Sequence, residues 1–317
     1  MRGVAALIVV IYHFEGVFPA TVPGGYLAVD LFFMLSGFVL AAVYLPRFER
    51  GMGVREFMIS RVRRLYPFYL VGLALGFAAL SYQDPLAALK SLPFGLVGLP
   101  APGTSADQMF RLNNPYWSLF AEWAVNIAFV VFLWRLRTVP LAATATLGAA
   151  ALIGAWWATG SLHDGAQWGD AWVGFARIAF SFPIGMLLHR AFLHFDLGRR
   201  RSRPHVLGLA LPVLMLPCFF GLPDLLVVML VFPALVLAGA ALEPLWRRWP
   251  LRLGELSYPL YCLHMPLQIA IRFIAIRTAW PELVGLAGFI GVVTVTVMAT
   301  YVAQRHARGA RPIPATT

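Results

Sequence analysis

Charged side chains are scarce in this chain of 317 residues: only 12% are Asp, Glu, Lys or Arg. Soluble globular proteins carry about 25% charged residues, which they need to cover their surface. Apolar residues make up 60% of the chain, and its mean hydropathy is +0.75. The composition therefore excludes an ordinary soluble enzyme and predicts a polytopic membrane protein.

Cysteine is also rare, and acidic residues are few. Cys218 and Cys262 both lie in apolar runs, so we expect two small buried side chains rather than a disulfide or an acyl-carrying thiol. The chain has 25 basic and 14 acidic residues, which gives a net charge of +11. Because basic residues beside membrane spans set topology, this excess does not indicate nucleic-acid binding.

Long apolar runs, separated by Pro, Gly and Arg clusters, indicate about ten membrane-spanning helices of roughly 20 residues each. The predicted fold class is an all-α polytopic transmembrane helical bundle. Because the spans use most of the chain, we expect residues 1–317 to form a single membrane-embedded domain with no separate soluble domain. The expected spans are 2–20, 25–45, 65–82, 116–135, 139–158, 171–190, 205–221, 224–242, 255–276 and 282–303.

Most basic residues fall on one side of these spans, and the positive-inside rule then places both termini in the cytoplasm. The first span has no small-residue cleavage site, so it is expected to be a retained signal anchor. The longest outer segment, about 83–115, is broken by prolines. We expect it to lie in the membrane interface or to re-enter as a lid.

Ionisable residues at bilayer depth are the first candidates for function, because an unpaired charge in lipid is costly. His13 follows Arg2 by eleven residues, about 16 Å along one helix face, which places Arg2 at the inner mouth and His13 near mid-bilayer. Structural ion pairs, such as Arg177 with either carboxylate, are the alternative explanation. The other candidates between mid-bilayer and its outer third are Asp30, Glu122, Arg177 and His264.

Several further residues have a simple explanation beside a functional one. Arg61 and Arg64 share one helix face, where topology control competes with a bidentate phosphate site. Ser36 and Ser257 are ordinarily small residues at helix contacts, and Trp117 is ordinarily an interface anchor.

Six blocks of sequence occur in a recognisable order. They are Arg2–His13, with an Arg-x10-His spacing, then Gly25–Phe38, Arg61–Pro67, Trp117–Glu122, Arg177–Gly185 and Leu253–Pro266. The second contains Asp-Leu-Phe-Phe and Ser-Gly-Phe, the third Arg-x-x-Arg-Leu-x-Pro, and the last Ser-Tyr and Tyr-x-x-His-x-Pro. In this order they resemble the acyltransferase 3 family, bacterial integral-membrane acyltransferases that modify surface sugars or antibiotics.

The resemblance implies a membrane O-acyltransferase of the bacterial inner membrane. Its donor would be cytoplasmic acyl-CoA, most simply acetyl-CoA, and its acceptor a hydroxyl of a carbohydrate, a lipid-linked glycan or a macrolide. The CoA phosphates would bind Arg2, Arg61 and Arg64. We expect His13 to be the general base, with a covalent acyl-histidine as the less favoured variant. No permanently bound cofactor and no metal is expected, because the histidines lack ligand spacing.

The remaining roles are also expectations from the resemblance. Asp30 or Glu122 would orient the ring of His13, and Arg177 or Tyr258 would stabilise the oxyanion. His264 would be a second proton carrier or an acceptor contact. The supporting or acceptor-contacting residues would be Ser36, Trp117, Ser257, Tyr258 and His264.

The chain departs from the family's pattern in two ways, and one other class of protein competes. Arg2 directly follows Met1, where family members usually have a short cytoplasmic stretch. The sequence also indicates a stand-alone form without the C-terminal hydrolase-like domain of many members. A proton-coupled secondary transporter of a small polar solute is the alternative, since buried charges also form proton relays. It predicts inverted repeats, which the sequence does not show.

Overall fold

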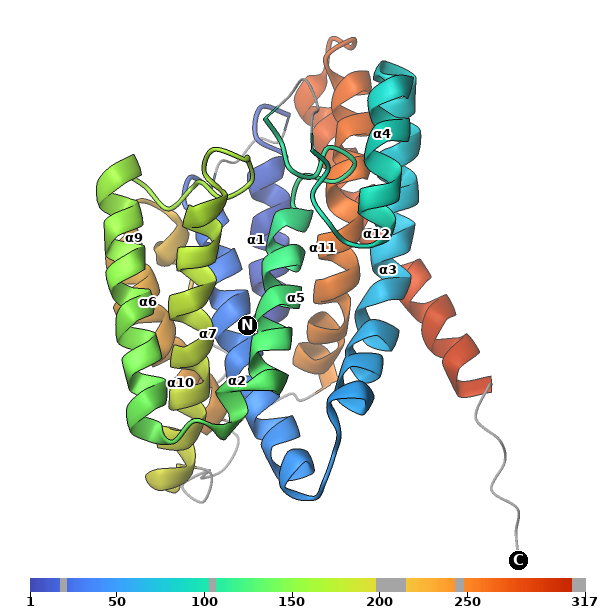
Figure 1. The fold of residues 1–317 in the computed structure, drawn as a ribbon. Helices are drawn as coiled ribbons and strands as arrows, with labels where there is room; N and C mark the ends of the chain where they lie inside the picture. The colour runs from blue at the N-terminus through green and yellow to red at the C-terminus, as the bar shows by residue number, and fades with distance from the viewer. Residues whose placement is uncertain (18–21, 103–106, 198–214, 243–247, 310–317) are drawn as a thin grey trace, which may run out of the picture.

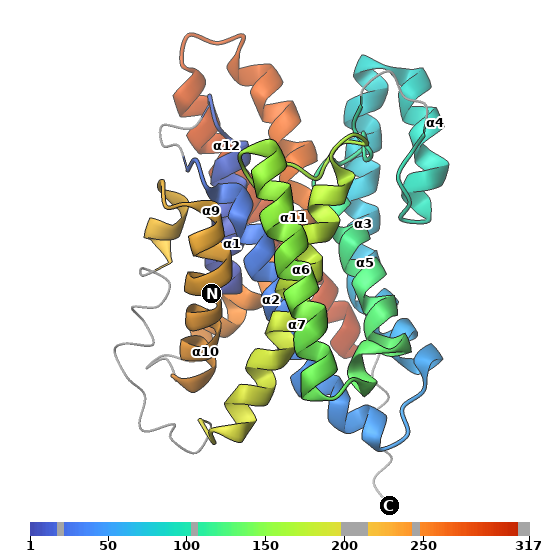
Figure 2. The same cartoon turned by 60° about the vertical axis from the view of Figure 1, so that its left-hand side comes forward.

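The computed structural model describes residues 1–17, 22–102, 107–197, 215–242 and 248–309, excluding the side chains of 248–250 and 306–309. Within these ranges the chain is helical, and the only β pairing is an isolated bridge between Gln108 and Gln167. The helices run side by side as a bundle (Figures 1 and 2). They are α1 (Arg2–His13), η1 (Gly25–Leu27), α2 (Ala28–Glu49), α3 (Val54–Gln83), α4 (Pro85–Leu96), α5 (Tyr116–Val131), η2 (Leu133–Arg135), α6 (Thr138–Thr159), α7 (Ala171–His194), η3 (Leu216–Phe219), α9 (Asp224–Leu226), the π-helix η4 (Val227–Val231), α10 (Phe232–Ala241), α11 (Arg248–Ala275) and α12 (Pro281–Gly309).

Six described segments are long and apolar enough to cross a membrane, whereas α1 and α5 are shorter apolar helices. The all-helical membrane class is therefore confirmed, while the count of ten spans stays a prediction. Most of the span expected at 205–221 lies outside the described residues. The six segments are Gly25–Glu49, Val54–Gln83, Thr138–Thr159, Ala171–His194, Asp224–Ala241 and Pro281–Arg305.

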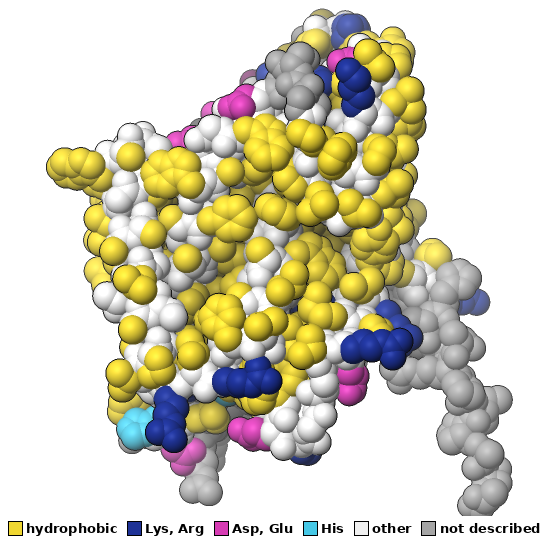
Figure 3. Space-filling view, in the orientation of Figure 1, with side chains coloured by type: hydrophobic (Ala, Val, Ile, Leu, Met, Phe, Trp, Pro, Cys, Tyr) yellow, Lys and Arg dark blue, Asp and Glu magenta, His cyan; other side chains and the backbone are white. Residues whose placement is uncertain are grey.

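The outer surface of the bundle is apolar. Figure 3 shows hydrophobic side chains over the middle of the visible face, with basic side chains along its lower rim and at its upper end. On α6, for example, Val139 is 80% exposed and Trp157 is 83% exposed. Large apolar side chains exposed in such number fit a protein surface that faces lipid.

Close contact between α2 and α7 forms the centre of the bundle, and α6 packs on α7. The contact depends on two glycines. A Cβ atom at Gly37 would lie 2.1 Å from the carbonyl oxygen of Phe182, and one at Gly185 would lie 2.0 Å from that of Met34. Small residues at such positions let two membrane helices approach closely.

The first helix differs from the expected span 2–20. It has 12 residues, about 18 Å of helix, which is shorter than the ~30 Å hydrocarbon core. The N-terminus lies at about mid-height of the bundle (Figures 1 and 2). The helix therefore begins inside the bundle and runs toward its upper end, while the depth of Arg2 and His13 in the membrane stays a prediction.

Two other segments also differ from expectation. α3 begins at Val54, eleven residues before the expected span, and it carries Arg61 and Arg64 on a helix, as their spacing predicted. The segment after α3 forms α4, which packs beside α3. Its N-cap, Asp84, accepts a hydrogen bond from the backbone N–H of Ala87 at 3.0 Å, and Pro85 occupies the first helical position, where no donor is lost.

Candidate active site

Two cavities lie inside the bundle, and we name them by their side chains. The arginine cavity has a volume of about 760 Å³, and the histidine cavity has a volume of about 160 Å³. Val29 and Tyr261 line both, so these side chains form the wall between them. Among others, the arginine cavity is lined by Arg2, Arg61, Arg64, Ser36, Glu122 and Tyr258, and the histidine cavity by Tyr12, His13, Tyr26, Trp117, His163 and Arg177.

The arginine cavity holds a partly satisfied charged cluster. Arg61 of α3 is 4% exposed, and its Nη2 lies 2.8 Å from Oε1 of Glu122 on α5. Ser36 of α2 donates a hydrogen bond to the same oxygen at 3.2 Å. The Nε atoms of Arg2 and Arg61 are buried without a hydrogen-bond partner. Because a buried unpaired donor is costly, these two Nε atoms are candidates for contact with a ligand.

The two histidines meet where α1 packs against α11. Nδ1 of His13 lies 2.8 Å from the carbonyl oxygen of Val9, and Nδ1 of His264 lies 2.8 Å from that of Tyr261. The separation between Nε2 of His264 and Nδ1 of His13 is 3.3 Å.

This geometry determines the tautomers of the neutral rings. A carbonyl oxygen only accepts, so each Nδ1 carries the proton. Nε2 of His264 then accepts from Nδ1–H of His13, and Nε2 of His13 keeps a free lone pair. His13 lines the histidine cavity, so this lone pair is the basic group available to a substrate there.

The carboxylates do not orient His13, which corrects one expected role. Asp30 and Arg177 are both 0% exposed and form an ion pair, with Nη2 of Arg177 lying 2.7 Å from Oδ2 of Asp30. Glu122 binds Arg61 instead. The ring of His13 is held by Val9 and His264.

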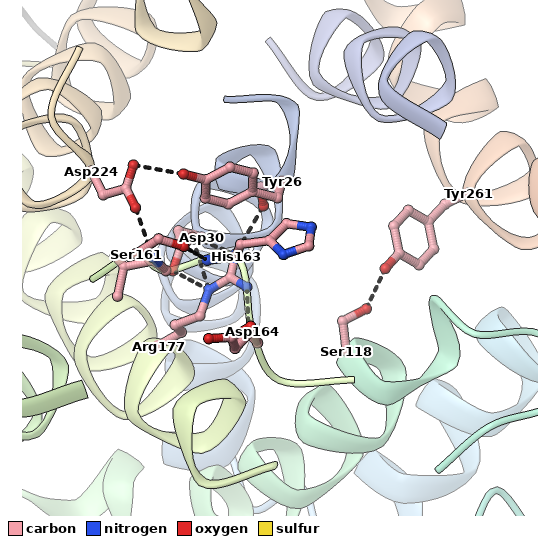
Figure 4. A network of polar contacts seen from close by, with 10 residues as sticks. Tyr26, Asp30, Ser118, Ser161, His163, Asp164, Arg177, Asp224 and Tyr261 are labelled. Carbon is pink, nitrogen blue, oxygen red and sulfur yellow. Dashed lines mark hydrogen bonds and ion pairs between the residues drawn. The ribbon is translucent and has the colours of Figure 1, made fainter. Parts of the chain in front are cut away.

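The guanidinium of Arg177 makes further contacts besides its ion pair with Asp30. It donates to the carbonyl oxygen of Tyr26 at 2.8 Å and to that of Asp164 at 3.2 Å, and it lies over the ring of Trp117. Figure 4 shows the contacts with Tyr26, Asp30 and Asp164 converging on this one side chain. Arg177 therefore holds the backbone around the histidine cavity, and most of its N–H groups are occupied.

The other expected site residues line the arginine cavity and have protein partners. Tyr258 donates its hydroxyl proton to the carbonyl oxygen of Leu65 at 2.8 Å, and Ser257 donates to that of Gly254 at 2.7 Å. The hydroxyl proton of Tyr258 is thus not free for an oxyanion, in contrast to the expected role.

The wall between the cavities is a hydrogen-bonded group. The hydroxyl oxygens of Tyr261 and Ser118 are 2.5 Å apart, and each hydroxyl lies 3.0 Å from the carbonyl oxygen of Pro115. The pair is visible at the right of Figure 4. These contacts hold Tyr261 in the wall between the two cavities.

Sequence reasoning missed the residues that the loop before α7 contributes. His163 lines the histidine cavity, and its Nε2 lies 2.5 Å from the hydroxyl oxygen of Tyr12. Asp224 accepts from the hydroxyl of Tyr26 at 2.8 Å and from the backbone N–H of Leu162 at 2.7 Å. The sequence analysis selected ionisable residues inside the predicted membrane spans. His163 lies in a polar loop outside those spans and was therefore not selected.

No group of three or more His, Cys, Asp or Glu side chains in the described part of the chain is arranged to hold a metal ion. The polar groups that line the cavities are instead arginine N–H donors in one and imidazole and phenol groups in the other. The fold and these cavities define an all-helical membrane protein with a buried polar site on each side of Tyr261.

Comparison with known proteins assigns the family. A family model described as an acyltransferase domain matches residues 1–304, so the chain belongs to the acyltransferase 3 family. It is therefore a membrane acyltransferase, as the six sequence blocks predicted. No solved structure matches the chain.

Three relatives illustrate the family's range. The chain is 40% identical over 147 residues to "Protein 2 in picA locus" of Rhizobium radiobacter, covering 41% of this chain and 77% of that protein. It is 33% identical to the peptidoglycan O-acetyltransferase OatA of Listeria monocytogenes, over 38% of this chain and 17% of that protein. It is also 33% identical to the acyltransferase MdmB of Streptomyces mycarofaciens, over 37% of this chain and 30% of that protein.

Proposed function

We propose that this protein transfers an acyl group, most simply acetyl, from acyl-CoA in the arginine cavity to a carbohydrate hydroxyl in the histidine cavity, with His13 as general base. One observation carries the proposal. Two polar cavities share the wall formed by Val29 and Tyr261, and each presents unpartnered groups of complementary chemistry. One offers guanidinium donors to phosphates, and the other offers a basic imidazole nitrogen to a hydroxyl.

The arginine cavity suits the nucleotide end of acyl-CoA. Five arginines and two glutamates line it, so its charge favours an anion. The Nε atoms of Arg2 and Arg61 are buried and unpartnered, and Arg64 lines the same space. Arginine binds phosphate oxygens through paired N–H donors, so a phosphate group would satisfy donors that the protein leaves without a partner.

The acyl end must then pass Tyr261 to reach His13. α1 connects the two cavities, since Arg2 lines one and His13 lines the other. Their separation along the helix is about 16 Å, which is of the order of the pantetheine arm's length. The wall therefore lies where the thioester carbonyl would meet the acceptor.

The chemistry follows from the tautomers. Nε2 of His13 accepts the proton of the acceptor hydroxyl while the hydroxyl oxygen attacks the thioester carbonyl. The carbon–sulfur bond breaks, and the CoA thiolate takes the proton back from the imidazolium. His264 accepts the Nδ1–H hydrogen bond throughout and stabilises the imidazolium, which is the role of the third group in a triad. Transfer through an acyl-His13 intermediate remains the less favoured variant.

The acceptor class and the location extend the family assignment. The relative OatA is named a peptidoglycan O-acetyltransferase, so we propose a cell-envelope glycan or a related hydroxyl compound as the acceptor. We also propose that the protein lies in the bacterial inner membrane with its lower, arginine-bearing rim in the cytoplasm (Figure 3), because basic residues remain on that side.

Release of free CoA by purified protein in proteoliposomes tests the proposal. The wild type should release CoA from acetyl-CoA when a glycan acceptor is present, and His13→Ala should lower the rate by about 10²-fold or more. His194→Ala is a matched control, because His194 is exposed at the end of α7 and lines neither cavity described above. Equal rates for His13→Ala and the wild type would remove His13 from the chemistry. Solute uptake without CoA release would favour a transporter.

A further inference from the structure

His163 lies in the histidine cavity together with His13, although it comes from the loop between α6 and α7. Its ring is exposed and lies between two phenols. The hydroxyl oxygen of Tyr12 is 2.5 Å from Nε2, and the ring centroid of Tyr26 is 5.2 Å away. In Figure 4 the imidazole points away from the Asp30–Arg177 pair, toward the side on which Tyr261 lies.

The backbone on both sides of His163 is fixed by buried charged side chains. Before it, the N–H of Leu162 donates to Oδ2 of Asp224 at 2.7 Å. After it, the carbonyl oxygen of Asp164 accepts from Nη1 of Arg177 at 3.2 Å. Asp224 and Arg177 are 9% and 0% exposed. These two hydrogen bonds fix the backbone on both sides of His163. The position of the His163 ring in the histidine cavity is therefore fixed as well.

The rest of this loop, from Gly165 to Asp170, is also fixed by a carboxylate. The carboxylate of Asp170 accepts from the backbone N–H groups of Gly165 at 3.0 Å and Gln167 at 2.8 Å. The bridge between Gln108 and Gln167 joins this loop to the one before α5. The resulting opening is lined by phenols, amides and an imidazole, which are groups that bind sugar hydroxyls and stack on sugar rings.

Charge further restricts the ligand. Arg177 is neutralised by Asp30 within 2.7 Å, so its cation does not attract an anion into the cavity. The carboxylates of Asp164 and Asp170 line the same space, and neither forms an ion pair within the described part of the chain. The cavity, with about 160 Å³, is smaller than the ~300 Å³ at which pockets for drug-sized ligands begin, so it admits one sugar unit rather than a long chain.

We propose that His163 is an acceptor-binding residue, which with Tyr12 holds the reacting hydroxyl of a neutral or positively charged sugar against Nε2 of His13. The inference rests on the proposed acyltransferase function and adds the acceptor subsite and its charge selectivity. The hydroxyl donates its proton toward His13 and accepts a hydrogen bond from the Tyr12–His163 pair. Loss of His163 therefore weakens acceptor binding without affecting acyl-CoA.

Steady-state kinetics in proteoliposomes with acetyl-CoA and three disaccharides test this directly. The acceptors are N,N′-diacetylchitobiose, which is neutral, chitobiose, which is cationic, and a disaccharide that ends in a uronic acid, which is anionic. We expect His163→Ala to raise the KM for the neutral sugar about 3- to 10-fold, the value of one hydrogen bond, and to leave the KM for acetyl-CoA unchanged. His163→Gln, which keeps a hydrogen-bonding side chain, should recover part of the loss.

Asp164→Asn tests the charge selectivity. We expect the wild type to have a higher kcat/KM for the neutral and cationic sugars than for the anionic one. In Asp164→Asn this difference in kcat/KM should be smaller. His194→Ala, an exposed histidine at the far end of α7, is the control for histidine loss.

The outcomes separate this inference from the proposed function. If His163→Ala had the same KM for the acceptor sugar as the wild type, the proposed acceptor subsite would be wrong. The same holds if the KM for the sugar and the KM for acetyl-CoA rose equally. Neither result would contradict the acyltransferase function. Equal use of the anionic sugar by the wild type would overturn the selectivity, and CoA release without transfer to any of the three would overturn the sugar class. A wild type that never releases CoA would refute the proposed function itself.

Discussion

Removing one charge of the Asp30–Arg177 pair should destabilise the protein strongly. Both side chains are 0% exposed, and Arg177 makes three of its hydrogen bonds to the two oxygens of Asp30. Asp30→Asn keeps the shape of the side chain but leaves a buried guanidinium without its counter-charge. Breaking a buried pair in this way costs about 3–5 kcal/mol.

The expected loss corresponds to a fall in the melting temperature of about 6–10 °C, taking about 2 °C per kcal/mol for a chain of this size. Fluorescence-monitored melting in detergent measures it. Glu49→Gln removes an exposed carboxylate at the end of α2 and is the matched control, with an expected change below about 1 kcal/mol. A melting temperature for Asp30→Asn equal to that of the control would refute the reasoning.

The double variant Asp30→Leu with Arg177→Met separates stability from positioning. Replacing both charges by apolar side chains removes the unpaired cation, so much of the stability should return. The carbonyl groups of Tyr26 and Asp164 still lose their donor, at about 1 kcal/mol each, and the loop that carries His163 is released. We therefore expect recovered melting without recovered acyl transfer. Recovery of both would show that Arg177 has no positioning role.

Three further substitutions test the rest of the structure. His264→Ala should lower kcat about 10²-fold without changing acyl-CoA binding, because the imidazolium of His13 loses the nitrogen acceptor of its Nδ1–H and keeps only the carbonyl oxygen of Val9; an unchanged kcat would contradict the pairing. Gly185→Leu should prevent folding, since its Cβ would lie 2.0 Å from the carbonyl oxygen of Met34. Size-exclusion chromatography measures the yield of folded protein, with Gly154→Ala as the control because its Cβ would meet open space; equal yields would contradict the clash. Tyr261→Ala should open the wall between the two cavities and raise the rate with butyryl-CoA relative to acetyl-CoA about 10-fold. An unchanged ratio of the two rates would show that Tyr261 does not limit the length of the acyl chain.

The sequence predicted the helical membrane class and the family well, because both rest on local signals. Apolar runs of about 20 residues identify spans without knowledge of the fold. The motif spacing also selected His13 and His264, whose rings lie 4.9 Å apart between centroids. Their separation of 251 positions gives no sign of that contact, so their pairing required the structure.

Depth along a helix could not show which residues share a cavity, because α1 does not begin at the end of the bundle. α1 starts inside the bundle, and Arg2 lines the arginine cavity together with Arg61. Depth also gave no means of matching charges. Glu122 and Asp30 have the same chemistry, and only the packing of α2 against α7 and of α3 against α5 decides which arginine each one meets.

The buried charges divide into two kinds, and the difference carries the functional argument. Arg177 and Asp30 satisfy each other and fix backbone carbonyls, so their cost of burial is met within the protein. Arg61 keeps an unpartnered Nε although it binds Glu122, and Nε of Arg2 has no partner at all. Both Nε atoms are exceptions to the rule that buried polar groups in native proteins are nearly always paired. Their persistence beside a cavity of about 760 Å³ is therefore better explained by a ligand that completes them, and an anion with several oxygens is the ligand that guanidinium groups complete best.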